Sequence, residues 1–191
     1  EDHGRFGFTS DYLTSGYSLK KLIHPDSEGD AYNKIVPYPW PIIRLSELYL
    51  NYAEALNEAN GPSQQVYDAL NNIRDRAGIP TVEQAWSDVS VAANPGKHTN
   101  VVGLREIIKQ ERLIELAFEG HRYNDLRRWK IAEEYLSSSI RGWSVDESSE
   151  ANFYNLRDIG IRSFSSPRDY LHPISFDEIS INPRLVQNPG W

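Results

Sequence analysis

The chain has 191 residues, enough for one ordinary domain with a buried core. Its 20 Lys and Arg against 27 Asp and Glu give a net charge of −7, which excludes a general nucleic-acid surface, because such a surface needs cations to neutralise phosphates. No apolar run approaches the length of a transmembrane helix, and the lack of Cys removes disulfides and cysteine-bound metals. Because the chain starts at Glu1 and has no Met, we expect it to be a piece of a longer protein.

The first half of the chain predicts one helical hairpin after an irregular start. Residues 1–41 are rich in Gly, Pro and aromatic residues and show no helical period. Residues 44–77 then carry two amphipathic stripes, separated by the turn Asn60–Ser63. A short loop between two helices predicts antiparallel packing. The stripe residues, which we expect to be buried, are Leu45, Leu48, Tyr49, Tyr52, Leu56 and Ala59 in the first helix and Val66, Leu70, Ile73 and Ala77 in the second.

The second half predicts another hairpin between two loop-rich segments. Residues 81–103 are interpreted as an irregular insertion, and residues 104–136 as a hairpin with a bend at Gly120. Each hairpin is close to the length of about 34 residues of a tetratricopeptide unit. Residues 137–191 are loop-rich, with one short helix after Ser175. We therefore expect a single, mostly α-helical domain of tetratricopeptide-like αα-hairpins (an α/α superhelix) with long, irregular, aromatic-rich loops.

Glu111, Glu115 and Glu119 follow one another at four-residue intervals on one helical face. Two such carboxylates could serve a glycosidase as acid and base. Stacked glutamates repel one another, however, unless cations lie among them. We therefore favour a half-buried ion-pair network around the bend, with its cations supplied by the same two helices, namely Arg105, Arg112, Arg122, Arg127 and Arg128.

Other catalytic or metal-binding patterns are missing from the sequence. The five His residues are dispersed, which argues against a zinc site. Asp26, Glu28 and Asp30 alternate as in a calcium loop but lack the bidentate Glu that would follow, so we interpret them as an exposed acidic turn. Nucleophile elbows, phosphate-binding Gly loops and dinucleotide fingerprints do not occur. We expect no catalytic residue, no metal and no cofactor.

Aromatic residues make up 12% of the chain. Those outside the expected helices could form a platform for sugars, which present apolar C–H faces edged with hydroxyls. The alternative is that loop aromatics fill gaps between helices. The aromatics on the helical stripes, which we expect to build the core, are Tyr49, Tyr52, Tyr67, Phe118, Tyr123, Trp129 and Tyr135.

Three ordered motifs resemble the SusD/RagB family. They are residues 44–55 (RLSELYLNYAEA), residues 111–129 (ERLIELAFEGHRYNDLRRW) and the ending from YLHPI at residue 170 to QNPGW at residue 191. The resemblance implies the carboxyl-terminal part of a longer outer-membrane lipoprotein on the cell surface. It also implies a non-enzymatic protein that captures nutrient oligosaccharides or polysaccharides and passes them to a SusC-like TonB-dependent transporter. Its lipid anchor would lie upstream of this chain.

No ligand-binding residue carries over from the family motifs, because sugar-binding aromatics lie in variable loops. Our candidates for glycan binding are Trp86, Trp143 and Tyr154, chosen as aromatics in the two irregular insertions. Two other functions stay open at this point. One is a tetratricopeptide-type scaffold that binds proteins, and the other is a glycosidase that uses the helix glutamates.

Overall fold

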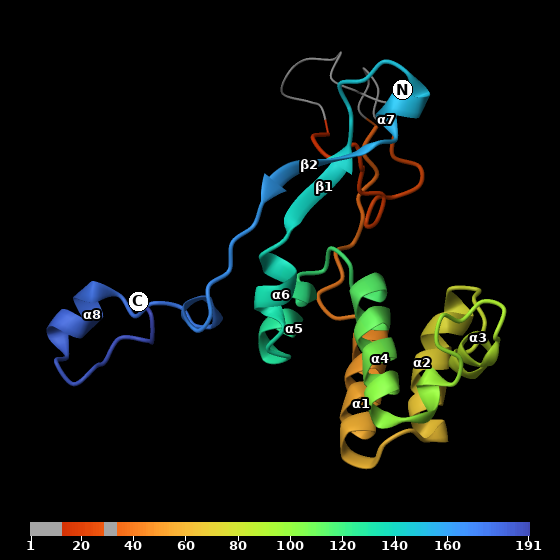
Figure 1. Ribbon diagram of the computed structural model, residues 1–191, viewed down its shortest axis with the longest axis horizontal. Helices are drawn as coiled ribbons and strands as arrows, with labels where there is room; N and C mark the ends of the chain where they lie inside the picture. Colours follow the sequence, from red (N-terminus) through yellow and green to blue (C-terminus); the bar gives the residue numbers. More distant parts are fainter. Residues whose placement is uncertain (1–12, 29–33) are drawn as a thin grey trace. The chain divides into compact units, whose positions relative to one another are not determined.

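The computed structural model describes residues 13–28 and 34–191, which form two compact units (Figure 1). The helical unit is Leu22–Arg122. The hairpin unit combines the described residues up to Lys21 with Tyr123–Trp191.

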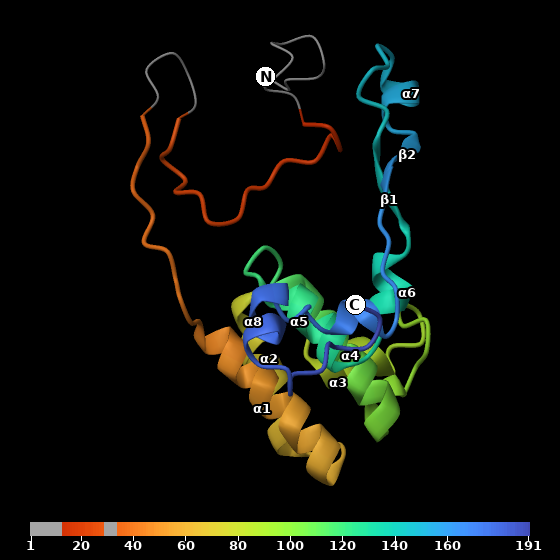
Figure 2. The ribbon, with the colours of Figure 1, turned by 90° about the vertical axis from the view of Figure 1, so that its left-hand side faces the viewer.

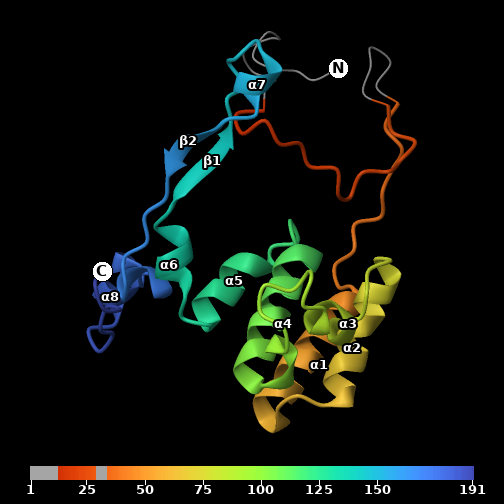
Figure 3. The same ribbon diagram turned by 45° about the vertical axis from the view of Figure 1, so that its right-hand side comes forward.

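Three helices make the body of the helical unit. Helix α1 (Leu45–Asn60) packs against both α2 (Gln64–Arg76) and α4 (Val101–Glu115). The short helix α3 (Val82–Ser87) contacts α2 (Figure 3). The 3-10 helix η1 (Lys97–Thr99) contacts both α3 and α4. The α1–α2 turn starts at Gly61, whose φ of 79° favours glycine. The fully buried side chains of this core include Leu50, Val66, Leu70, Val82, Leu104, Ile107 and Ile108.

The buried face of α1 differs from the one expected. Leu50 and Ala53 are fully buried, whereas Leu45, Leu48 and Tyr52 are 61%, 53% and 50% exposed. The helix is apolar on two faces, and periodicity alone does not tell which face the neighbouring helices cover. Several aromatics expected in the core are also exposed, namely Tyr52, Phe118, Tyr123 and Tyr135, and Phe118 lies in a turn rather than on a helix.

The start of α4 is fixed by a side-chain cap. Asn100 accepts a hydrogen bond at 2.8 Å from the backbone N–H of Gly103, so the helix begins at Val101 rather than at residue 104. The insertion before it also contains α3, which was not expected. Thr81 and Gln84 form a capping box at its start.

Replacing Asn100 with alanine is expected to destabilise the helical unit by about 1 kcal/mol, because an N–H of the first turn of α4 loses its acceptor. The matched control is Ser63→Ala at the start of α2, where the N-cap side chain makes no capping bond. Urea denaturation of both variants measures the difference. Equal losses at the two sites would contradict the role given to Asn100.

The hairpin unit is built around two antiparallel strands. Strand β1 (Ser139–Trp143) pairs with β2 (Leu156–Ile161), so that Trp143 lies opposite Leu156 and Ser139 opposite Ile161. Helix α7 (Glu150–Phe153) lies in the connection, at the far end of the strand pair from α6 (Figure 2). This strand pair was not expected from the sequence, because neither strand has a sustained β-rich alternation.

Short helices flank the strands. Helices α5 (His121–Arg128) and α6 (Ala132–Leu136) precede them, and η2 (Arg168–Tyr170) and α8 (Phe176–Ile181) follow. Leu126, Ala132 and Phe164 form a small buried core. The short helix expected after Ser175 is α8, although the Ser175 side chain makes no capping bond.

The segment expected to form the second hairpin is divided differently. Helix α4 packs against α1, and the chain turns at Phe118 and Gly120, which have φ of 64° and 83°. The expected helix 121–136 is two helices, α5 and α6, separated at Lys130, whose φ is 58°. The mostly α-helical fold expected from the sequence is confirmed. Among the described residues, no helix is both long and apolar enough to cross a bilayer.

Candidate functional site

Four aromatic side chains of the hairpin unit form one cluster, which we call the Trp143 cluster: Tyr17, Trp143, Phe153 and Tyr154. Tyr17 and Tyr154 have ring centroids 5.3 Å and 4.8 Å from that of Trp143. Phe153 is nearly parallel to Trp143, with centroids 6.4 Å apart, and meets Tyr154 edge to face at 5.2 Å. Trp143 therefore lies at the centre of the cluster, with the other rings around it.

Close backbone packing holds the segment with Tyr17 against strand β1. The N–H of Trp143 donates to the carbonyl of Ser15 at 3.0 Å. A Cβ on Gly142 would lie 2.7 Å from the Cα of Ser15, and one on Gly16 would lie 2.7 Å from Cδ1 of Trp143. Two glycines thus permit an approach that any larger residue would block.

The Trp143 cluster presents an aromatic surface with polar neighbours. Tyr154 and Tyr17 are 55% and 53% exposed, whereas Trp143 is half-buried beneath them. Asn152 lies on α7, and its side-chain amide donates to Glu147 at 3.4 Å. Arg157 pairs with Asp146 at 3.5 Å and donates to the carbonyl of Trp143. Exposed rings beside amides and charged groups offer an apolar face for C–H groups and hydrogen-bonding partners for hydroxyls.

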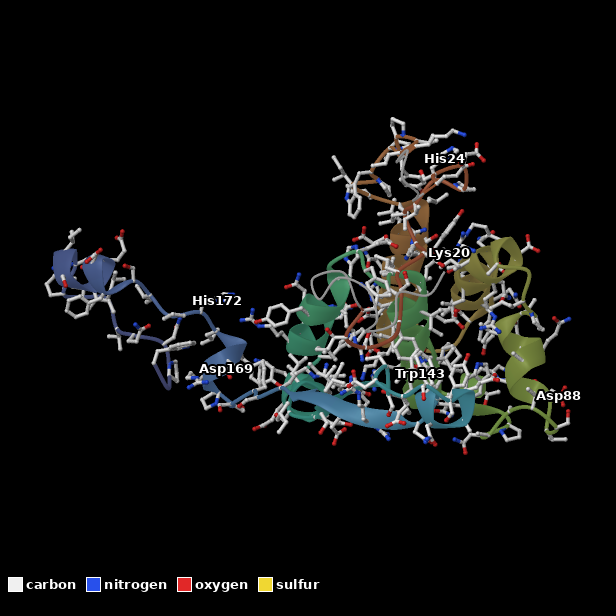
Figure 4. The ribbon with its side chains drawn as sticks, turned by 90° about the horizontal axis from the view of Figure 1, so that it is seen from above. Lys20, His24, Asp88, Trp143, Asp169 and His172 are labelled. Atoms are coloured by element: carbon white, nitrogen blue, oxygen red, sulfur yellow. The ribbon has the colours of Figure 1, made fainter. Side chains whose placement is uncertain are left out.

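The structure brings together two of the three residues predicted to bind a glycan. Trp143 (Figure 4) ends strand β1. Tyr154 follows α7, and both residues belong to the hairpin unit. Trp86 lies in the helical unit on α3, where it packs against the core, with the Lys97 ammonium 5.3 Å from its ring centre. The glycan role of Trp86 stays a prediction. Sequence reasoning missed Tyr17 and Phe153, since no local pattern pairs residue 17 with residue 143.

The three glutamates take part in an ion-pair network that includes arginines not expected there. Glu111 and Glu115 lie on α4, and Glu119 follows its end. Arg44, just before α1, binds Glu119 through two hydrogen bonds of 2.8 and 2.7 Å, and binds Glu115 at 2.8 Å. In α2, Arg76 binds Glu115 at 2.7 Å and Arg74 binds Glu111. By contrast, Arg105 pairs with Glu58 and Arg128 with Asp125.

This network is well shielded from solvent. The side chains of Glu111, Glu115 and Glu119 are 14%, 13% and 11% exposed. The hydrogen bond to Glu119 raises the pKa of Arg44 above its ordinary value. The carboxylates are thus engaged in holding helices together, which supports a structural role over an acid–base pair.

The described residues contain no group of three side chains that could hold a metal ion. Of the acidic turn considered above, Asp26 and Glu28 belong to these residues, while Asp30 lies outside them. His24 lies 3.8 Å from Asp26, and Glu28 forms an isolated backbone bridge with Lys34.

Comparison with known proteins identifies the family. The SusD family profile matches residues 4–191. Two curated relatives from Formosa agariphila are SusD-like protein P2, 31% identical over 78% of this chain, and SusD-like protein P25, 30% identical over 77%. The chain spans 25% and 23% of their respective lengths.

Solved structures agree with these relatives. A structure of BT4246 superposes with a TM-score of 0.78 at 28% identity, covering 97% of this chain and 31% of that one. A SusD-like protein from Bacteroides fragilis superposes with a TM-score of 0.62 at 33% identity, covering 88% and 28%. The fold is thus that of the SusD-like class, and the chain belongs to the SusD family. Proteins of this family generally bind nutrient glycans rather than transform them.

Proposed function

We propose that this chain is part of a cell-surface protein that captures oligosaccharides or polysaccharides and delivers them to a SusC-like TonB-dependent transporter in the outer membrane. The proposal includes a lipid anchor outside this chain and no catalytic step. The single observation that carries it is the Trp143 cluster, an exposed aromatic surface in a chain of the SusD family.

The geometry of the cluster suits a sugar ring. Tyr154 meets Trp143 at an interplanar angle of 81°, so the two rings form a corner rather than a stack. One face of a pyranose is apolar and packs against such rings, while its hydroxyls reach polar groups at the edge. Because Phe153 and Tyr17 brace Trp143, little side-chain freedom is lost on binding.

Replacing Tyr154 with alanine is expected to weaken oligosaccharide binding by roughly threefold to tenfold, the free-energy scale of one aromatic contact. Isothermal titration calorimetry with the best ligand from a glycan array measures the effect. The matched control is Tyr52→Ala, which removes a tyrosine of similar exposure, 50% against 55%, from helix α1.

Thermal unfolding of both tyrosine variants should stay close to that of the wild-type chain, since both side chains are about half exposed. The proposed site is wrong if Tyr154→Ala binds as the wild type does, or if Tyr52→Ala loses as much affinity. Trp143→Ala is a less direct test, because Trp143 also packs against Gly16 and Tyr17.

A further inference from the structure

The hairpin unit contains a hollow whose lining residues, from Tyr123 to Trp191, include none of the Trp143 cluster. It has a volume of about 480 Å³, within the range of small-molecule sites of about 300–1,000 Å³. Phe164, 7% exposed, and Leu136 belong to the small core beneath it. Tyr123 and Trp191 supply aromatic walls, and Arg162, Asp169 and His172 supply polar ones. Figure 4 shows Asp169 and His172 along the same stretch of chain.

The two aromatic side chains of the hollow are held in place, yet each remains about half exposed to solvent. The indole N–H of Trp191 donates to the carbonyls of Arg168 and Leu171 at 3.0 and 3.2 Å, and the Arg168 guanidinium lies 5.3 Å from the ring centre. The guanidinium of Arg127 lies 5.1 Å from the centre of Tyr123. Even so, Trp191 and Tyr123 are 50% and 45% exposed, so part of each ring is available to a ligand.

The charges at the hollow do not cancel. Arg162 hydrogen-bonds only to Ser138, and Arg127 to His172 and the carbonyl of Tyr170, so within the described part of the chain neither has a carboxylate partner. Asp169, the one acidic side chain of the lining, is bound by Arg168 at 2.7 Å. That hydrogen bond keeps the pKa of Asp169 below its usual value. Arg162 and Arg127 are thus two cations at the hollow without an acidic side-chain partner among the described residues, in a chain of net charge −7.

His172 adds a hydrogen-bond donor. Its Nε2 lies 3.2 Å from Nη1 of Arg127. A guanidinium only donates, so Nε2 accepts, and the proton of the neutral ring is on Nδ1.

We propose that the hollow formed by Tyr123, Trp191, Arg162 and His172 binds an acidic sugar residue, a pyranose bearing a carboxylate or a sulfate group. The proposal rests on the glycan-binding function above and names the class of ligand. The aromatic walls take the ring, and the Arg162 guanidinium takes the oxyanion through Nη1, since its Nε and Nη2 already donate to Ser138.

Calorimetry on the 191-residue chain with matched ligand pairs tests this assignment. One pair is tetragalacturonate and its methyl ester, and the other is a sulfated galactan tetrasaccharide and its desulfated form. We expect at least one acidic ligand to bind more tightly than its neutral counterpart, with a preference that falls as salt rises. The pair that shows the preference distinguishes carboxylate from sulfate.

The variant Arg162→Gln should lower affinity for the preferred acidic ligand roughly tenfold and leave the neutral counterpart unchanged, since one charge-assisted hydrogen bond is lost. The control Arg141→Gln removes an arginine from strand β1 that lies 3.9 Å from Asp158, and should change neither affinity. The assignment is overturned if neither acidic ligand is preferred, or if both variants lose affinity equally. Glycan binding that depends on Tyr154 but not on Arg162 would overturn this assignment and keep the proposed function, whereas no binding of any glycan would overturn both.

Discussion

Replacing Arg44 with alanine is expected to destabilise the helical unit by about 3 kcal/mol, because Glu115 and Glu119 stay buried without their main cation. Arg44 donates to both carboxylates and also to the backbone carbonyl of Glu115 at 2.9 Å. Its side chain is 22% exposed, so solvent replaces little of what is lost. Chemical denaturation followed by circular dichroism at neutral pH measures the change.

The matched control is Arg105→Ala, since Arg105 also holds one glutamate, Glu58, through two hydrogen bonds of 2.6 Å. These side chains are 35% and 41% exposed, so the expected loss is below about 1 kcal/mol. The hydrogen bond from Arg105 lowers the pKa of Glu58, so this small contribution is present at neutral pH and disappears as pH falls through that lowered value. Equal losses for the two variants would show that burial does not decide the strength of these pairs.

Replacing Leu50 with alanine is expected to destabilise the chain by about 2–5 kcal/mol, the usual result of leaving a cavity in a packed core. Leu50 has no exposed surface and lies among side chains of α1, α2 and α4. The same substitution at Leu48, two residues earlier in the helix and 53% exposed, should change stability by less than about 0.5 kcal/mol.

This pair of variants decides which face of α1 supports the fold. The periodicity of the sequence placed Leu48 in the core, and the structure places Leu50 there. Thermal and urea unfolding of the two variants in parallel gives the answer. A larger loss for Leu48→Ala would mean that the observed buried face is not the one that stabilises the chain in solution.

Local signals were sufficient for some elements and insufficient for others. The α1–α2 hairpin was predictable because Gly61 and Ser63 mark its turn and the stripe of α2 is unambiguous. The choice between two apolar faces of α1 was not, since it depends on where α4 packs. The pairing of β1 with β2 was also missed, because their partners are fixed by distant contacts such as that between Trp143 and Ser15.

In the candidate site, too, local signals identified some residues but not the contacts between them. Trp143 and Tyr154 could be chosen from the sequence as loop aromatics, but their contact depends on the strand pair and on α7. An ion-pair network was predicted around the three glutamates, but Arg44, Arg74 and Arg76 were not expected among its cations. Charge spacing along one helix identifies the carboxylates, whereas the arginines that reach them come from other helices, which no local pattern specifies.

Two of the three glutamates have a consequence for how α4 is aligned with its neighbours. Glu111 and Glu115 lie one helical turn apart on α4, whereas Glu119 follows the end of the helix and the turn at Phe118. A slide of α4 by one turn, about 5.4 Å, would place one of the two where the other was, and so would keep part of the charge pairing. The alignment must come from contacts without this repeat, such as Asn57 to the carbonyl of Val101 at 3.0 Å and Arg112 to Asn51 at 2.7 Å. In this unit the ion pairs hold the helices together, and the hydrogen bonds of two asparagines fix their alignment.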